Sequence, residues 1–205
     1  MIKNLLFDLG GVIMDIRRQD CIEAYRRLGM REPERFFGEY SQQGPFKLLE
    51  EGKMSVDEFH TVMRAEFDSA VTDAEIDAAF CAFLTGIPVH RLEALRELRK
   101  RYGIYLLSNT NEIMWQSKIA DEFRKEGRER EDYFDGIVTS FEAKALKPDA
   151  RIFDYACHKL GIRPDETLFV DDSQSNLDAA AALGFKTLLA TPGSEFPEAI
   201  AALGL

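Results

Sequence analysis

Short apolar runs alternate with helical patterns along the second half of this chain of 205 residues. Parallel neighbouring strands require a long crossover connection, usually a helix, so this alternation predicts right-handed βαβ units. A further apolar run opens the chain and adds a first strand. The sequence therefore predicts an α/β fold, a Rossmann-like parallel sheet flanked by helices. The predicted strands are residues 2–7, 104–107, 137–139, 168–170 and 187–189.

The stretch between the first and second predicted strands has a different pattern. Residues 16–87 show apolar side chains at helical spacing and no clear strand. Ser55 with Glu58, and Thr72 with Glu75, fit capping boxes that open two of these helices. We therefore predict an inserted all-helical subdomain at residues 16–87, and a core formed by residues 1–15 and 88–205.

Composition excludes several classes of partner. The formal net charge is −10, without a long run of Lys or Arg, which argues against nucleic acid or an anionic membrane as the partner. The opening apolar run is interrupted by Asp8, so it is too short to span a membrane and is not a convincing signal peptide. Cys21, Cys81 and Cys157 lack paired or metal-ligand spacing and suit a reducing compartment, which predicts a cytoplasmic protein.

Polar side chains follow the apolar runs wherever a predicted strand ends. Asp8 follows the first strand, Ser108 the second, and the pair Asp171-Asp172 follows the fourth, while Lys147 lies in the connection after the third. The carboxyl ends of parallel strands meet at one edge of a sheet, where ligands of open α/β sheets bind. Adjacent carboxylates there repel each other and lose hydration unless a cation meets them. The sequence thus predicts one site that contains three carboxylates, a hydroxyl and an ammonium group.

Phosphoryl transfer through a carboxylate nucleophile needs this set of groups. Asp8 is the predicted nucleophile, and Mg²⁺ is the predicted cofactor because it prefers oxygen ligands and bridges carboxylates to phosphate. We expect Asp8 and Asp172 to bind it directly, Asp171 directly or through water, and the Gly10 carbonyl to add an oxygen. The predicted ligands of the transferred phosphoryl group are Ser108 and Lys147, with Asn109 as a further candidate for substrate binding.

Four ordered motifs support a family resemblance. Residues 7–12, 106–110, 147–149 and 170–176 resemble the motifs of the haloacid dehalogenase-like hydrolase superfamily, and the resemblance covers nearly the whole chain. It implies that Asp8 is the nucleophile, that Ser108 and Lys147 bind phosphate, and that Asp171 and Asp172 are the metal acids. It also implies that the first strand lies in the middle of the sheet. The helical insert resembles the cap of that superfamily, which closes over the site and selects the substrate.

One position departs from the family pattern. Phosphatases of this superfamily usually carry a second Asp two residues after the nucleophile as general acid and base, and this chain has Gly10 there. We predict that Asp15, the nearest downstream carboxylate, projects over the site and takes over proton transfer.

The predicted function is a Mg²⁺-dependent phosphatase of a small organic phosphate such as a sugar phosphate. One alternative is a 2-haloacid dehalogenase, which the Asp171-Asp172 pair disfavours because a metal-free site gains nothing from added negative charge. The other is a non-catalytic protein that binds phosphate and metal, which Gly10 favours. The predicted partner is a small phosphorylated molecule, and the sequence carries no signal for an oligomeric state.

Overall fold

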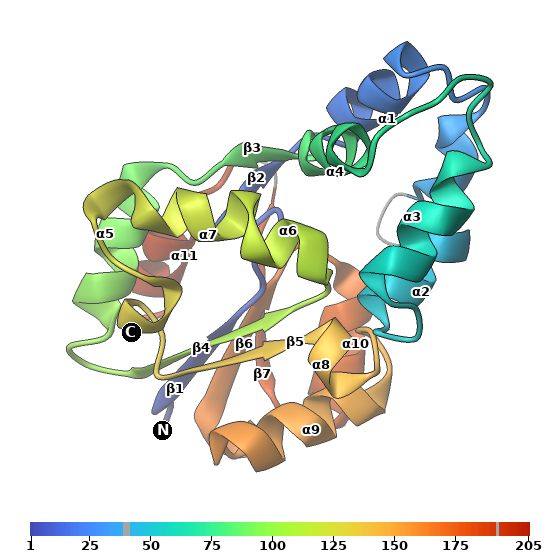
Figure 1. Ribbon diagram of the computed structural model, residues 1–205. Helices are drawn as coiled ribbons and strands as arrows, with labels where there is room; N and C mark the ends of the chain where they lie inside the picture. The colour runs from blue at the N-terminus through green and yellow to red at the C-terminus, as the bar shows by residue number, and fades with distance from the viewer. Residues whose placement is uncertain (39–41, 192) are drawn as a thin grey trace.

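A five-stranded parallel sheet forms the centre of the molecule. The computed structural model describes residues 1–38, 42–191 and 193–205. The strand order is β5-β4-β1-β6-β7, with every neighbouring pair parallel and β1 in the middle (Figure 1). The predicted α/β class and the central position of the first strand are both confirmed. The strands are β1 (Asn4–Phe7), β4 (Gly103–Ser108), β5 (Gly136–Thr139), β6 (Thr167–Asp171) and β7 (Lys186–Leu189).

Helices cover both faces of the sheet because the side chains of β1 are buried on both. Successive residues of a strand point to opposite faces. Leu6 belongs to one apolar cluster together with residues of α9 (Ala150–Leu160) and α10 (Gln174–Ala182). Leu5 and Phe7 belong to the other, which includes residues of α5 (Val89–Leu98) and α11 (Phe196–Ala202). On that face the rings of Phe7 and Phe196 meet edge to face at 5.1 Å.

Residues 16–87, called the helical insert below, pack around an aromatic cluster of their own. Phe46 lies at its centre, with ring centroids 4.7 Å from Phe37, 4.8 Å from Phe80 and 5.1 Å from Phe59. The capping boxes predicted at Ser55 and Thr72 are present and open α3 and α4. The elements of the insert are α1 (Arg18–Arg27), η1 (Pro33–Phe36), α2 (Gly44–Glu50), α3 (Val56–Arg64) and α4 (Asp73–Cys81).

The prediction that no strand lies between residues 16 and 87 is wrong in detail. Strands β2 (Asp15–Ile16) and β3 (Leu84–Gly86) form an antiparallel pair where the chain leaves the core and returns to it. The two segments run side by side because the insert begins and ends at the same place. They are too short for an alternating apolar pattern to reveal them.

The single helix predicted at residues 113–125 is divided into three pieces. Ser117 has non-helical backbone angles, and its hydroxyl donates a hydrogen bond of 2.6 Å to the carbonyl of Ile113. Such bonding to the preceding turn competes with the helix and bends it. The pieces are α6 (Glu112–Gln116), α7 (Lys118–Phe123) and η2 (Arg124–Glu126). The remaining short helices are η3 (Arg130–Asp132), α8 (Ser140–Ala143) and η4 (Pro164–Glu166).

In the part of the chain that the structure describes, no helix combines the length and the apolarity that a membrane crossing requires. The insert reaches back to the core at α2, which contacts α8 beside the carboxyl ends of the strands (Figure 1). This contact places the end of α2 next to the predicted site.

Candidate active site

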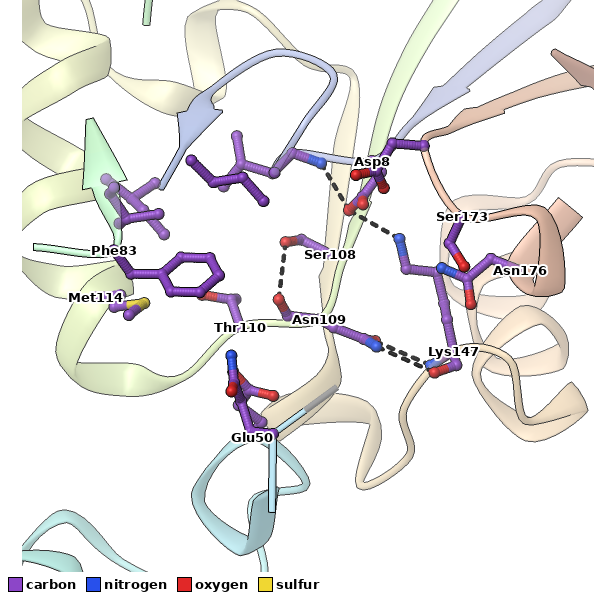
Figure 2. A pocket seen from close by; sticks show the side chains of 17 residues that line it. Asp8, Glu50, Phe83, Ser108, Asn109, Thr110, Met114, Lys147, Ser173 and Asn176 are labelled. Carbon is purple, nitrogen blue, oxygen red and sulfur yellow. Dashed lines mark hydrogen bonds and ion pairs between the residues drawn. The ribbon is translucent and has the colours of Figure 1, made fainter. Parts of the chain in front are cut away.

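A cavity of about 110 Å³ lies at the carboxyl ends of β1, β4 and β6, where the sequence predicts the site. The core lines it with the predicted site residues Asp8, Gly10, Ser108, Asn109, Lys147 and Asp172 (Figure 2). The helical insert adds residues from β2, α2 and the segment around β3. The cavity therefore lies between the core and the insert.

Lys147 links two of the carboxylates at the sheet edge. Its ammonium nitrogen lies 2.8 Å from Asp8 Oδ1 and 2.7 Å from Asp171 Oδ2, and its side chain is 1% exposed. Burial alone would lower the pKa of Lys147, but the charges of Asp171 and Asp8 outweigh burial and raise it. Lys147 therefore stays a cation and holds Asp8 in place from the side of the sheet.

Asp171 is fully buried and its oxygens already have partners. Besides Lys147, it accepts hydrogen bonds from the backbone N–H of Ser173 at 2.8 Å and from Asn176 Nδ2 at 3.0 Å. Asp172 lines the cavity instead, and burial followed by the charge of Asp171 raises its pKa to about 6. Asp172 is thus the acid of this pair that faces the cavity, whereas Asp171 mainly orients Lys147.

Asp8 is held so that one of its oxygens stays available. Oδ1 accepts a hydrogen bond of 2.7 Å from the backbone N–H of Leu9 and makes the ion pair with Lys147, while neither contact uses Oδ2. Burial raises the pKa of Asp8 to about 7 against the opposing charge of Lys147. Gly11 has a φ of +74°, and a Cβ there would overlap the Asp172 carboxylate. The glycine therefore allows Asp172 to lie against the loop that follows β1.

The acidic groups fit a divalent cation. Asp8, Asp171 and Asp172 each offer an oxygen, and these atoms lie within 4.8 Å of one another, the only such group among the described residues. Together with Lys147, three carboxylates and one ammonium group leave a formal charge of −2. An all-oxygen donor set of this charge suits Mg²⁺. Asp8 and Asp172 are the residues that would hold it, and Gly10 lines the same cavity.

The two predicted substrate-binding residues after β4 differ in their surroundings. The Ser108 hydroxyl lines the cavity, and the only acceptor within reach in the described structure is the Asn109 carbonyl at 3.5 Å, so a ligand can displace that contact. Asn109 donates from Nδ2 to the Lys147 carbonyl at 3.1 Å and accepts at Oδ1 from the Lys147 N–H at 2.9 Å. Asn109 therefore fixes the backbone of Lys147, a positioning role that the sequence did not indicate.

The expectation that Asp15 projects over the cavity is wrong. Asp15 lies in β2 with its side chain 52% exposed, and it forms an ion pair of 2.8 Å with Arg91. Its neighbour Ile16 lines the cavity, whereas Asp15 does not, and the pairing with β3 is irregular between these two residues. Because Asp15 pairs with Arg91 outside the cavity lining, the geometry does not support a role in proton transfer.

Sequence reasoning gave no role to four polar residues of the cavity, namely Gln42, Glu50, Thr110 and Ser173. Glu50 is the last residue of α2, where a negative charge opposes the helix dipole, and this unfavourable position was a signal for it. Burial raises the pKa of the Glu50 carboxyl to about 8.

Comparison with known proteins agrees with this geometry. A model of the haloacid dehalogenase-like hydrolase family matches residues 2–184. The chain belongs to the haloacid dehalogenase-like hydrolases. It is 37% identical over 196 residues to the D-ribitol-5-phosphate phosphatase of Bacteroides thetaiotaomicron, which covers 96% of this chain and 95% of that protein.

Solved structures of this family have the same architecture. A wild-type enzyme of the family from Bacteroides thetaiotaomicron, in complex with magnesium and inorganic phosphate, superposes with a TM-score of 0.89 at 38% identity and covers 96% of this chain and 98% of that one. A predicted hydrolase of the family from Porphyromonas gingivalis superposes with a TM-score of 0.91 at 31% identity, covering 99% of this chain and 98% of that one. The predictions of a hydrolase of the phosphatase type and of Mg²⁺ as its cofactor are confirmed.

Proposed function

We propose that this hydrolase removes phosphate from a small phosphorylated polyol or sugar through a covalent phosphoryl intermediate on Asp8. The main support for the proposal is the position of Asp8. It lies in the cavity, Lys147 forms an ion pair with it, and the carboxylate of Asp172 lines the same cavity. The substrate class is supported by the relative that acts on D-ribitol 5-phosphate and by the small volume of the cavity, about 110 Å³.

The residues of the site divide the reaction into two displacements. Asp8 Oδ2 attacks phosphorus and an oxygen–phosphorus bond forms while the bond from phosphorus to the sugar oxygen breaks. The proton of the phosphate monoanion passes to the sugar oxygen, so that the sugar leaves as an alcohol. Lys147 and Ser108 hold the phosphoryl oxygens, where negative charge accumulates during the transfer. Mg²⁺ bound by Asp8 and Asp172 supplies further neutralisation of that charge. In the second displacement, water attacks the phosphorus and the bond to Asp8 breaks. Both protons of the water leave on dihydrogen phosphate, and the Asp8 carboxylate is restored.

We further propose that the helical insert, residues 16–87, acts as the cap that closes the site and selects the substrate. The cavity supports this role because Ile16, Glu50 and Phe83 of the insert line it together with Asp8 of the core. Closure over a phosphoester excludes water during the first displacement. The cytoplasmic location remains a prediction from composition.

The two alternatives are less well supported by the site. A dehalogenase needs a nucleophile in a metal-free pocket, whereas three carboxylates within 4.8 Å of one another repel without a cation. A non-catalytic binding protein would not need a nucleophile held by Lys147 with its second oxygen unused. Both observations favour the phosphatase.

A substrate panel tests the proposal. Release of inorganic phosphate is measured from ribitol 5-phosphate, other pentose and hexose phosphates, and p-nitrophenyl phosphate, with Mg²⁺ and with EDTA. We expect Mg²⁺-dependent turnover with polyol or sugar phosphates as the best substrates. A folded, metal-loaded protein that releases no phosphate from any compound would refute the function, and a haloacid assay would then test the dehalogenase alternative.

A further inference from the structure

The end of the cavity bounded by the helical insert contains buried polar atoms that have no hydrogen-bond partner among the described residues. Gln42 Oε1 and Thr110 Oγ1 are buried and lack a hydrogen-bond partner among the described residues, and the two residues are 8% and 4% exposed. Both line the cavity that holds Asp8. Buried polar atoms in native proteins almost always have partners, so these two atoms are available to the polar groups of a ligand in the cavity.

Glu50 adds a third polar side chain to this end of the cavity. It is 7% exposed and lines the same cavity, and its carboxyl makes no hydrogen bond or ion pair with the described residues. Figure 2 shows Glu50 below Thr110 and Asn109, at the end of the cavity away from Asp8. Because burial raises the pKa of Glu50 to about 8, its carboxyl carries a proton at neutral pH and can donate as well as accept.

Contacts between the insert and the core fix the positions of these groups. Ser140 Oγ lies 2.7 Å from the Glu50 carbonyl and 2.9 Å from the Thr110 carbonyl, and it accepts a hydrogen bond of 3.0 Å from the Thr110 N–H. Lys144 Nζ donates to the Gly52 carbonyl at 2.7 Å. The end of α2 is therefore attached to α8, and Glu50 and Thr110 are held on the same buried serine.

The remaining wall of the cavity is apolar. Phe83, Met114 and Ile119 line it on the side opposite Lys147, as Figure 2 shows for Phe83 and Met114. A cavity with one apolar wall and a set of unpaired donors and acceptors matches a molecule that carries both C–H groups and hydroxyl groups. Hydroxyls suit this set because each can donate to Gln42 Oε1 or Glu50 and accept from Thr110.

We propose that Gln42, Glu50 and Thr110 form a hydroxyl-binding subsite that makes the enzyme select polyol and sugar phosphates over alkyl phosphates. The inference rests on the proposed function, because it assigns residues to the leaving group of that reaction. A site built around buried hydrogen-bonding groups discriminates strongly against an analogue without the hydroxyl, since its own groups are then left unpaired.

Two substrates with the same carbon chain test the subsite. The ratio of kcat/KM for ribitol 5-phosphate to that for n-pentyl phosphate measures recognition of the hydroxyls alone, since both carry the same phosphate. Thr110→Val removes one hydroxyl with little change of shape, and Glu50→Leu removes the carboxyl. Glu51→Gln is the matched control, because Glu51 is the next residue and pairs with Lys53 at 2.9 Å outside the cavity lining.

We expect the ratio to fall at least tenfold in Thr110→Val and in Glu50→Leu, and to remain at the wild-type value in Glu51→Gln. In the Asp8→Asn background, we expect titration calorimetry to show that Thr110→Val and Glu50→Leu lose tenfold more affinity for ribitol 5-phosphate than for inorganic phosphate. Equal losses for both substrates, or no loss in the isosteric Thr110→Val, would overturn the subsite. A wild-type enzyme inactive on both substrates would instead refute the proposed function.

Discussion

Substitution of Glu50 should change how the stability of the protein depends on pH. Its carboxyl is buried in the cavity without a partner among the described residues, and burial raises its pKa from 4.5 to about 8. Glu50→Gln keeps the size and shape of the side chain but removes its ionisation. We predict that this variant is more stable than the wild type at neutral and alkaline pH.

The magnitude follows from proton linkage. Glu50 binds its proton more tightly in the folded state than in the unfolded state. Its contribution to the free energy of unfolding is therefore fully present below the pKa of the unfolded state, and it is lost as the pH rises through the pKa of the folded state. Each tenfold difference in proton affinity corresponds to about 1.4 kcal/mol. The unfolded state loses this proton above pH 4.5, whereas the folded state keeps it up to about pH 8. Glu50 therefore lowers the free energy of unfolding by about 3 kcal/mol at pH 7 and by about 5 kcal/mol above pH 8. The amide of Glu50→Gln has no such cost at any pH.

Urea denaturation at pH 5 and pH 8.5, in EDTA, measures the effect. Asp8 and Asp172 also titrate, but they do so in both proteins and cancel in the comparison. The stability difference between Glu50→Gln and wild type should grow by about 4 kcal/mol between these two pH values. Glu51→Gln, the matched control, should show no such growth. A difference that is the same at both pH values would refute the assignment of Glu50 as a buried, unpaired acid.

Three further predictions concern the metal acids and the loop after β1. Because burial raises the pKa of Asp8 to about 7 and of Asp172 to about 6, Mg²⁺ affinity measured by calorimetry should rise with pH up to about 8, and a flat profile would contradict this. Asp15→Asn should keep turnover of alkyl phosphates within about threefold, because Asp15 pairs with Arg91 away from the cavity; a loss of roughly a hundredfold would restore its proton-transfer role. Gly11→Ala should lower the free energy of unfolding by more than about 1 kcal/mol and weaken Mg²⁺ binding, because the added Cβ would overlap the Asp172 carboxylate. Unchanged values would show that the loop after β1 adjusts to the added methyl group without cost.

The residues at the strand ends were predictable because one physical rule places them. In a parallel sheet every strand ends at the same edge, so Asp8, Ser108 and Asp172 had to meet once the alternation of strands and helices was recognised. Lys147 follows the same rule through the connection after β5. Periodicity and local sequence are sufficient for such residues, since no contact between distant elements has to be known.

The rest of the site depends on contacts that one sequence does not specify. Glu50 reaches the cavity because Ser140 binds its carbonyl across 90 positions of the chain, and no local pattern encodes that contact. The prediction that Asp15 projects over the cavity was wrong for a related reason. The short pairing of β2 with β3 is irregular between Asp15 and Ile16, and it leaves Ile16 in the cavity lining and Asp15 outside it. A strand this short has no alternating pattern that the sequence could reveal.

A covalent phosphoryl group on Asp8 is the most direct test of the central claim. The metal-loaded enzyme is mixed with ribitol 5-phosphate or p-nitrophenyl phosphate, quenched in acid during the first turnover, and digested for mass spectrometry. We expect one phosphoryl group on the peptide that contains Asp8, and none in Asp8→Asn. Rapid phosphate release without an adduct, or with an adduct on another residue, would contradict the assignment of Asp8 as the nucleophile.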